Sequence, residues 1–169
     1  ALAEACAERG AEVTLVAGPV SLKTHHPAIK RIDVESAGEM YQAAMTAFPS
    51  SDAAILCAAV ADYRPENASE QKIKRETERE MTLHLVPNPD IAASLGAIKR
   101  EGQVMVGFAL ETNDEATHAE GKLKRKNLDF IVLNSLRDQG AGFRCDTNKI
   151  TIIDNAGGVT SYPLKTKRE

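Results

Sequence analysis

The sequence predicts an open, doubly wound, mostly parallel α/β sheet of the Rossmann type, on two observations. Short apolar segments that end at small or turn-forming residues alternate with longer segments of helical composition. One apolar segment, residues 53–58, contains almost no polar side chain, which is typical of a strand covered by helices on both faces. Ligands of such sheets bind beyond the carboxyl ends of the strands. We therefore expect the site in the loops after Ala17, Ala58, Val86 and Ala109.

The first elements alternate regularly. Residues 1–9 are rich in Ala, Glu and Arg and are predicted to be helical, and Gly10 stands where a left-handed cap would end the helix. A short apolar strand is expected at residues 11–17, closed by Gly18 and Pro19. A strand, a helix and a buried strand are then predicted at residues 29–34, 37–48 and 53–58.

Residues 61–80 break this alternation, because they are charged, contain Pro and lack Gly, and show no steady period. We predict a mobile flap there and a strand at residues 81–86. Asn88 is expected to cap a helix that begins at Pro89 and ends near Lys99. A strand, a helix, a strand and a terminal hairpin complete the prediction, at residues 104–109, 114–126, 130–134, and 150–154 with 159–162. Residues 155–158 supply the hairpin turn.

Composition favours one domain, residues 1–169, that acts on a small molecule. The net charge of −3 gives no case for a nucleic-acid or anionic-membrane partner. Cys6, Cys57 and Cys145 are far apart, which argues against a disulfide framework or a zinc site and fits a reducing cytoplasm. No apolar run approaches the ~20 residues that span a bilayer, and the histidines lack metal-ligand spacing. The metal ligands stay unassigned.

Three loops that follow predicted strands carry distinctive residues: 58–65 (AAVADYRP), 88–91 (NPDI) and 107–112 (GFALET). Residues 72–75 (KIKR) and 122–129 complete an ordered series. The series resembles the bacterial phosphopantothenate-cysteine ligase family, in which this domain usually follows a flavin-dependent decarboxylase. The family domain starts earlier, with a Gly-Pro-Thr strand end and a loop that holds an Asn implicated in handling the intermediate. We therefore expect the first strand, from the middle of the sheet, to be missing here.

The resemblance implies a two-step amide synthesis. The carboxylate of 4'-phosphopantothenate attacks the α-phosphate of CTP, pyrophosphate leaves, and the amine of L-cysteine attacks the acyl-cytidylate. The first step joins two anions and therefore needs cations, and Mg2+ is expected. The resemblance also implies a homodimer, and FMN only on a fused decarboxylase domain outside this chain.

Lys72 is the catalytic candidate, because it matches the family lysine that binds the nucleotide. With Lys74 and Arg75 it lies in the predicted flap, which could bring positive charge to the leaving group and shield the intermediate from water. Arg75 stands where the family usually has Lys. Taken alone, this charged stretch would be read as a solvated loop.

The resemblance implies nucleotide-binding roles for residues on several predicted elements: Asp62, Pro89, Asp90, Ile91, Ala92, Phe108, Lys122 and Lys126. Ala58 and Ala59 would let the backbone approach the substrate. Asp62 is expected to be a buried carboxylate that needs a partner, and Asp90, being anionic, to contact base or ribose. Without the resemblance, Asp62 would be read as a local backbone cap and residues 89–92 as helix capping. Phe108 would be read as core packing, and Lys122 and Lys126 as a solvated helix face.

Two other functions stay open. The fold also suits a pyridine-nucleotide oxidoreductase, although the chain contains no GxGxxG, and NADPH binding with hydride transfer would identify that activity. A non-catalytic module that binds CTP or assembles a larger enzyme would bind nucleotide without turnover. No residue distinguishes CTP from ATP.

Overall fold

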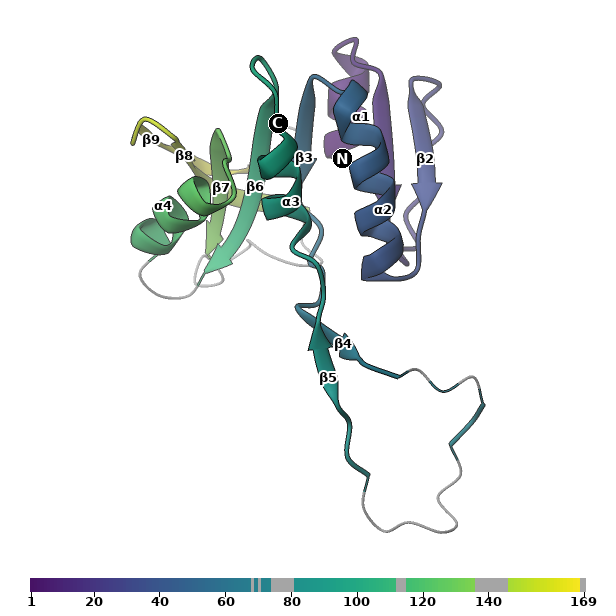
Figure 1. Ribbon diagram of the computed structural model, residues 1–169. Helices are drawn as coiled ribbons and strands as arrows, with labels where there is room; N and C mark the ends of the chain where they lie inside the picture. Colours follow the sequence, from purple (N-terminus) through teal and green to yellow (C-terminus); the bar gives the residue numbers. More distant parts are fainter. Residues whose placement is uncertain (68, 70, 74–80, 112–114, 136–145, 168–169) are drawn as a thin grey trace.

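The computed structural model describes residues 1–67, 69, 71–73, 81–111, 115–135 and 146–167 (Figure 1). Its largest sheet has five strands in the order β3-β6-β7-β8-β9. These strands are β3 (Ala53–Leu56), β6 (Val104–Glu111), β7 (Phe130–Ser135), β8 (Thr147–Asp154) and β9 (Val159–Thr166). Two smaller sheets pair β1 (Val13–Ala17) with β2 (Ile29–Asp33) and β4 (Tyr63–Pro65) with β5 (Leu85–Pro87).

The sheets are mainly parallel on the amino-terminal side of the fold. β1 runs parallel to β2, and β6 runs parallel to both β3 and β7. β8 and β9 are antiparallel and close the sheet with the expected hairpin. Its turn uses Gly157 at φ +89°, a conformation that glycine adopts without strain. The predicted α/β class is confirmed.

The helices are α1 (Leu2–Glu8), α2 (Ala37–Ala47), α3 (Ile91–Ile98) and α4 (Glu115–Arg125), with a short 3-10 turn, η1 (Phe48–Ser50). Gly10 ends the first helical segment at φ +92°, as predicted. α2 begins with a capping box, in which the Ser36 hydroxyl accepts from Glu39 N–H and the Glu39 carboxylate accepts from Ser36 N–H. Figure 1 shows α2, α3 and α4 lying over one face of the sheets.

The main core lies between the five-stranded sheet and the helices α3 and α4. Its most buried large side chains are Leu95, Met105, Ile131 and Ile153. Gln103 is buried beside them with both ends of its amide satisfied. Its Nε2 donates to the carbonyls of Phe48 at 3.0 Å and Ser51 at 2.6 Å, and its Oε1 accepts from Arg100 N–H at 2.8 Å. Burying this amide is tolerable because no polar atom is left unpaired.

β3 is less buried than predicted. Its residues alternate between exposed and half-buried, and Ile55 keeps 41% of its surface exposed. Among the described strands, β3 is hydrogen-bonded to β6 alone and β1 to β2 alone. In Figure 1 β1 lies between β2 and β3, so the unpaired edges of β1 and β3 face each other. An edge strand with an uncovered face cannot bury every side chain.

Two boundaries differ from the prediction near residue 85. The strand expected at residues 81–86 is β5, Leu85–Pro87, and it pairs with β4, which lies inside the predicted flap. α3 begins at Ile91 because Asp90, rather than Asn88, is its cap. The Asn88 side chain is used elsewhere, since its Nδ2 donates to the carbonyl of Ala61 at 2.8 Å.

Candidate functional site

Two of the loops that carry candidate residues, the loop after β3 and the loop before α3, meet at the carboxyl edge of the sheet. The antiparallel strands β4 and β5 form an arm that projects from this edge (Figure 1). Asn88 N–H donates to the Asp62 carbonyl at 2.8 Å and joins the two sides of the arm at its base. The chain thus brings the Asp62 loop and the Asn88 loop together, as expected for a site built from strand ends.

Arg64 fixes the same junction. Its Nη1 donates to the Pro87 carbonyl at 2.8 Å and to Asn88 Oδ1 at 3.3 Å. Asp62 itself is exposed, and the prediction that it is a buried carboxylate is wrong. The reason is that Asp62 lies where the arm leaves the sheet, so that its side chain faces solvent. An exposed carboxylate is free to accept from a ligand hydroxyl or amino group.

At the amino terminus of α3, the Asp90 carboxylate makes both a hydrogen bond and an ion pair. Asp90 Oδ1 accepts from Ala93 N–H at 3.0 Å, which caps the helix. Its Oδ2 lies 3.0 Å from Lys126 Nζ. Burial raises the pKa of Asp90, but the Ala93 hydrogen bond and the hydrogen bond and charge of Lys126 outweigh it and hold the pKa below its ordinary value. The Asp90 carboxylate is therefore ionised at neutral pH.

Phe108 lies in β6 between Gly107 and Ala109, in register with Val132 of β7. It is half-buried, whereas its neighbours on either side are buried. Gly107 packs so closely against Leu128 that a Cβ there would touch Leu128 Cδ1 at 2.7 Å. Phe108 is therefore less buried than Gly107 and Ala109, the residues on either side of it in β6. Ala58 and Ala59, after β3, are exposed, and their small side chains leave the backbone open to a ligand.

The structure describes some of the predicted basic side chains but not all of them. Lys122 and Lys126 lie in and just after the last turn of α4 and are both half-buried. Lys72 is exposed on the arm, and within the described part of the chain no hydrogen bond or ion pair joins it to the other candidates. Lys74 and Arg75 lie outside the described residues. The structure therefore brings Asp90 and Lys126 together but does not bring Lys72 to them.

Sequence and structure comparisons agree on the family. A family model described as DNA/pantothenate metabolism flavoprotein C-terminal domain matches residues 1–169. The chain belongs to this family. It is 36% identical to a solved structure titled as the C-terminal domain of the coenzyme A biosynthesis bifunctional protein CoaBC, with a TM-score of 0.78, covering 99% of this chain and 74% of the other.

Two relatives are similar over most of the chain. One, from Vibrio parahaemolyticus, is named coenzyme A biosynthesis bifunctional protein CoaBC and is 50% identical over 154 residues, 90% of this chain and 38% of the relative. Another, from an unknown prokaryotic organism, is named cysteine/cysteine sulfinic acid decarboxylase and is 57% identical over 169 residues, all of this chain and 47% of the relative. The chain spans less than half the length of both relatives.

One further candidate in this flavoprotein C-terminal domain escaped the sequence analysis. Asn134 stands near the carboxyl end of β7, opposite Leu110 of β6. Its Oδ1 is fully buried and has no hydrogen-bond partner among the described residues. A buried, unpartnered oxygen at a strand end marks a place where a ligand group could donate. The available signal was an Asn directly after the apolar run Ile131–Leu133.

The described residues of the domain contain no group of three His, Cys, Asp or Glu side chains that could hold a metal ion. Mg2+ is usually bound through one or two carboxylates together with substrate phosphates. An exposed carboxylate such as Asp62 fits that pattern and does not fit a protein cage. None of the described helices is long and apolar enough to cross a membrane.

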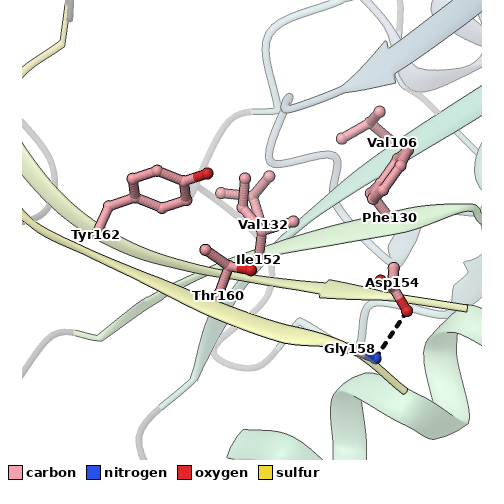
Figure 2. Close-up of a pocket in the computed structure, with 8 residues that line it drawn as sticks. All are labelled: Val106, Phe130, Val132, Ile152, Asp154, Gly158, Thr160 and Tyr162. Atoms are coloured by element: carbon pink, nitrogen blue, oxygen red, sulfur yellow. Dashed lines mark hydrogen bonds between the residues drawn. The ribbon is translucent and has the colours of Figure 1, made fainter. Parts of the chain in front are cut away.

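The domain also has a hollow on a face of the five-stranded sheet, and the candidate Phe108 pairs with Val132 of its lining without lining it itself. Figure 2 shows apolar side chains around it, and these come from β6, β7, β8 and β9. Asp154 lies at one end and accepts from Gly158 N–H at 2.8 Å. The apolar lining consists of Val106, Phe130, Val132, Ile152 and the ring of Tyr162. No predicted nucleotide-binding residue lines the hollow, so it is not part of the candidate site.

Proposed function

We propose that this chain is a ligase domain that joins 4'-phosphopantothenate to L-cysteine in coenzyme A biosynthesis, using CTP and passing through an acyl-cytidylate. The family match over the whole chain and the similarity to the CoaBC C-terminal domain support it. The observation that carries it is the pairing of Asp90 with Lys126 at the amino end of α3, beside the base of the arm. That arrangement puts a cation and free helix N–H groups where an anionic nucleotide can bind.

In the first step a carboxylate attacks a phosphate, so the site has to reduce the repulsion between two anions. Lys126 and Lys122 would contact the phosphates from α4. In the stretch from Pro89 to Ala92, the backbone N–H groups of the three residues after the proline would contact the nucleotide at the start of α3. Lys72, Lys74 and Arg75 would approach from the arm and neutralise the charge that develops on pyrophosphate.

The remaining candidates would orient the two substrates. The half-buried Phe108 can pack against base or ribose, and Asp62 can accept from a nucleotide hydroxyl or from a phosphate-bound Mg2+. Ala58 and Ala59 leave room for the phosphopantothenate chain. Mg2+, when bound, would supply further charge stabilisation at the phosphates.

Homodimerisation, fusion to an FMN-binding decarboxylase domain and a cytoplasmic location complete the proposal. The name of the bifunctional relative, of which this chain matches 38%, supports the fusion. Light scattering that finds only monomer would contradict the dimer.

The test is release of radiolabelled pyrophosphate from CTP in the presence of Mg2+ and 4'-phosphopantothenate. It should be run on this chain and on a version extended at its amino terminus by a relative's first strand and loop. Release that depends on phosphopantothenate in the extended protein would support the ligase. Absence of release from both proteins, when both are folded and bind CTP, would contradict it.

A second candidate is a non-catalytic nucleotide-binding module. The split between the β1-β2 sheet and the five-stranded sheet favours it, because β1 and β3 have no partner on their facing edges among the described strands. CTP binding without turnover in the extended protein would identify it. No feature of the described residues favours hydride transfer. The relative named as a decarboxylase extends well beyond the region that matches this chain, so its name does not assign decarboxylation to this domain.

A further inference from the structure

Asp90 uses both carboxylate oxygens inside the protein. Oδ1 accepts the Ala93 N–H that caps α3, and Oδ2 holds the Lys126 ammonium, each at 3.0 Å. Each oxygen keeps a second acceptor site, but rotating the side chain toward the base or ribose of a nucleotide would break one of these contacts. Loss of the cap would leave a helix N–H unpaired, and loss of the ion pair would release Lys126.

Lys126 is held at its backbone as well as at its ammonium. Its carbonyl lies against Gly96 of α3 so closely that a Cβ there would collide with it. Asn127, at φ +50°, donates from Nδ2 to the Gly96 carbonyl at 3.0 Å and locks the same junction. Gly96 lies six residues after Asp90, about 9 Å along a helix that rises 1.5 Å per residue. The Lys126 side chain therefore runs along α3 toward its amino terminus.

We infer that Asp90 is a positioning residue for Lys126, whose carboxylate holds the ammonium ready for the nucleotide phosphates and does not itself contact the nucleotide. The inference rests on the proposed function. It gives Asp90 a different role from the contact with base or ribose that the sequence suggested. The backbone of residues 89–92 keeps its proposed place against the nucleotide.

Two effects of the Asp90 carboxylate oppose each other. Its negative charge weakens the attraction between this end of α3 and a phosphate, whereas its contact with Lys126 restricts a long, flexible side chain before the ligand arrives. The Asp90 side chain is 50% exposed and that of Lys126 28%, so water and salt screen the repulsion. We therefore expect the positioning effect to exceed the repulsion.

The substitution Asp90→Asn separates the two tasks, because Asn caps a helix as well as Asp but cannot form the ion pair. The expected result, by isothermal titration of this chain with CTP, is a Kd raised about 3- to 10-fold at unchanged Tm. Lys126→Met should raise the Kd about 10- to 100-fold. The double variant should bind no more weakly than Lys126→Met alone, because Asp90 acts through Lys126. Asp33→Asn, which removes a 63% exposed carboxylate from its ion pair with Arg31 on β2, is the matched control and should bind normally.

Additive effects in the double variant would overturn the inference, because they would mean that Asp90 meets the nucleotide itself. An unchanged Kd in Asp90→Asn would overturn it as well. In the extended, active protein, Asp90→Asn should raise the KM for CTP and leave kcat within about two-fold. If the parent binds CTP but releases no pyrophosphate, only the proposed ligase activity fails. If the parent binds no CTP, both proposals fail.

Discussion

Gly96 of α3 lies directly against the carbonyl group of Lys126, the residue that follows α4. The contact lets the two helices approach at backbone distance, and Lys99 Nζ reinforces it by donating to the Asn127 carbonyl at 3.2 Å. Backbone packed against backbone cannot move aside as a flexible side chain can. The position of Lys126, and with it the proposed phosphate contact, therefore depends on residue 96 having no side chain.

Gly96→Ala should destabilise the domain by about 1–3 kcal/mol, because the new methyl group must push α3 away from residue 126. It should also weaken CTP binding by displacing Lys126. The check is urea unfolding together with CTP titration. Gly121→Ala in α4 is the control, since its Cβ would meet nothing closer than Arg125 Nη1 at 3.9 Å. Alanine is the better helix former, so this control should be neutral or stabilising by up to about 1 kcal/mol. Equal effects of both substitutions would contradict the packing argument.

Asp129 should make stability depend on pH below about 4. Its Oδ2 lies 2.6 Å from Lys99 Nζ and accepts from Met105 N–H at 2.7 Å. Burial raises the pKa of Asp129, but the Lys99 and Met105 contacts together lower it below the ordinary value. Because the pKa of Asp129 is lower in the folded than in the unfolded protein, its ionisation stabilises the fold. This contribution is complete above the unfolded pKa, about 3.9, and is lost as the pH falls through the folded pKa.

Asp129→Asn should therefore cost about 1–3 kcal/mol at pH 7, because it leaves Lys99 largely buried without its partner. The difference in unfolding free energy from the parent should shrink as the pH falls below 4. Chemical unfolding at several pH values measures both quantities. A difference that is constant from pH 7 to pH 2 would show that the Asp129 charge is not responsible. Asp33→Asn is the control here too, and because the Asp33 carboxylate is 63% exposed its loss should change the unfolding free energy much less.

Lys72→Ala should slow acyl-cytidylate formation by about 100-fold in a protein that is active in pyrophosphate release, since a lysine that neutralises developing charge is then lost. Lys72 is exposed, so the fold should be unaffected. Single-turnover formation from labelled CTP measures the rate, and circular dichroism checks the fold. Lys30→Ala, at an exposed position of β2, should leave the rate unchanged. If Lys72→Ala forms the acyl-cytidylate at the parent rate in a single turnover, Lys72 has no catalytic role.

A strand supplied at the amino terminus should pair between β1 and β3. Fusing the segment that precedes the matched region in the Vibrio parahaemolyticus relative should raise Tm by about 2–4 °C for each kcal/mol gained. Backbone amides of β1 and β3 at the facing edges should exchange more slowly, because they would gain hydrogen-bond partners. A scrambled segment of equal length is the control. Unaltered exchange at both strands would mean that the expected strand does not belong there.

Much of the secondary structure could be predicted from the sequence, because its signals are local. The change between strand and helix periods located most elements, and glycines at residues 10 and 157 marked turns that need positive φ. The predictions failed where a distant partner decided the outcome. Asn88 looked like a helix cap, but its side chain is bonded to Ala61, twenty-seven residues away. β3 looked buried, but its exposure depends on which strands flank it.

The sequence by itself determined the α/β class, the order of most elements and the expectation of a site at strand ends, since hydrophobic period and turn chemistry act over a few residues. The individual candidate residues came from the family resemblance. Only the tertiary structure decided that Asp90 meets Lys126, that Lys99 meets Asp129 and that Asn134 has a buried oxygen with no partner among the described residues. These relationships join residues that lie far apart in the chain or arise from burial by distant elements. They depend on how α3 and α4 pack on the sheet, and a local pattern carries no information about that packing.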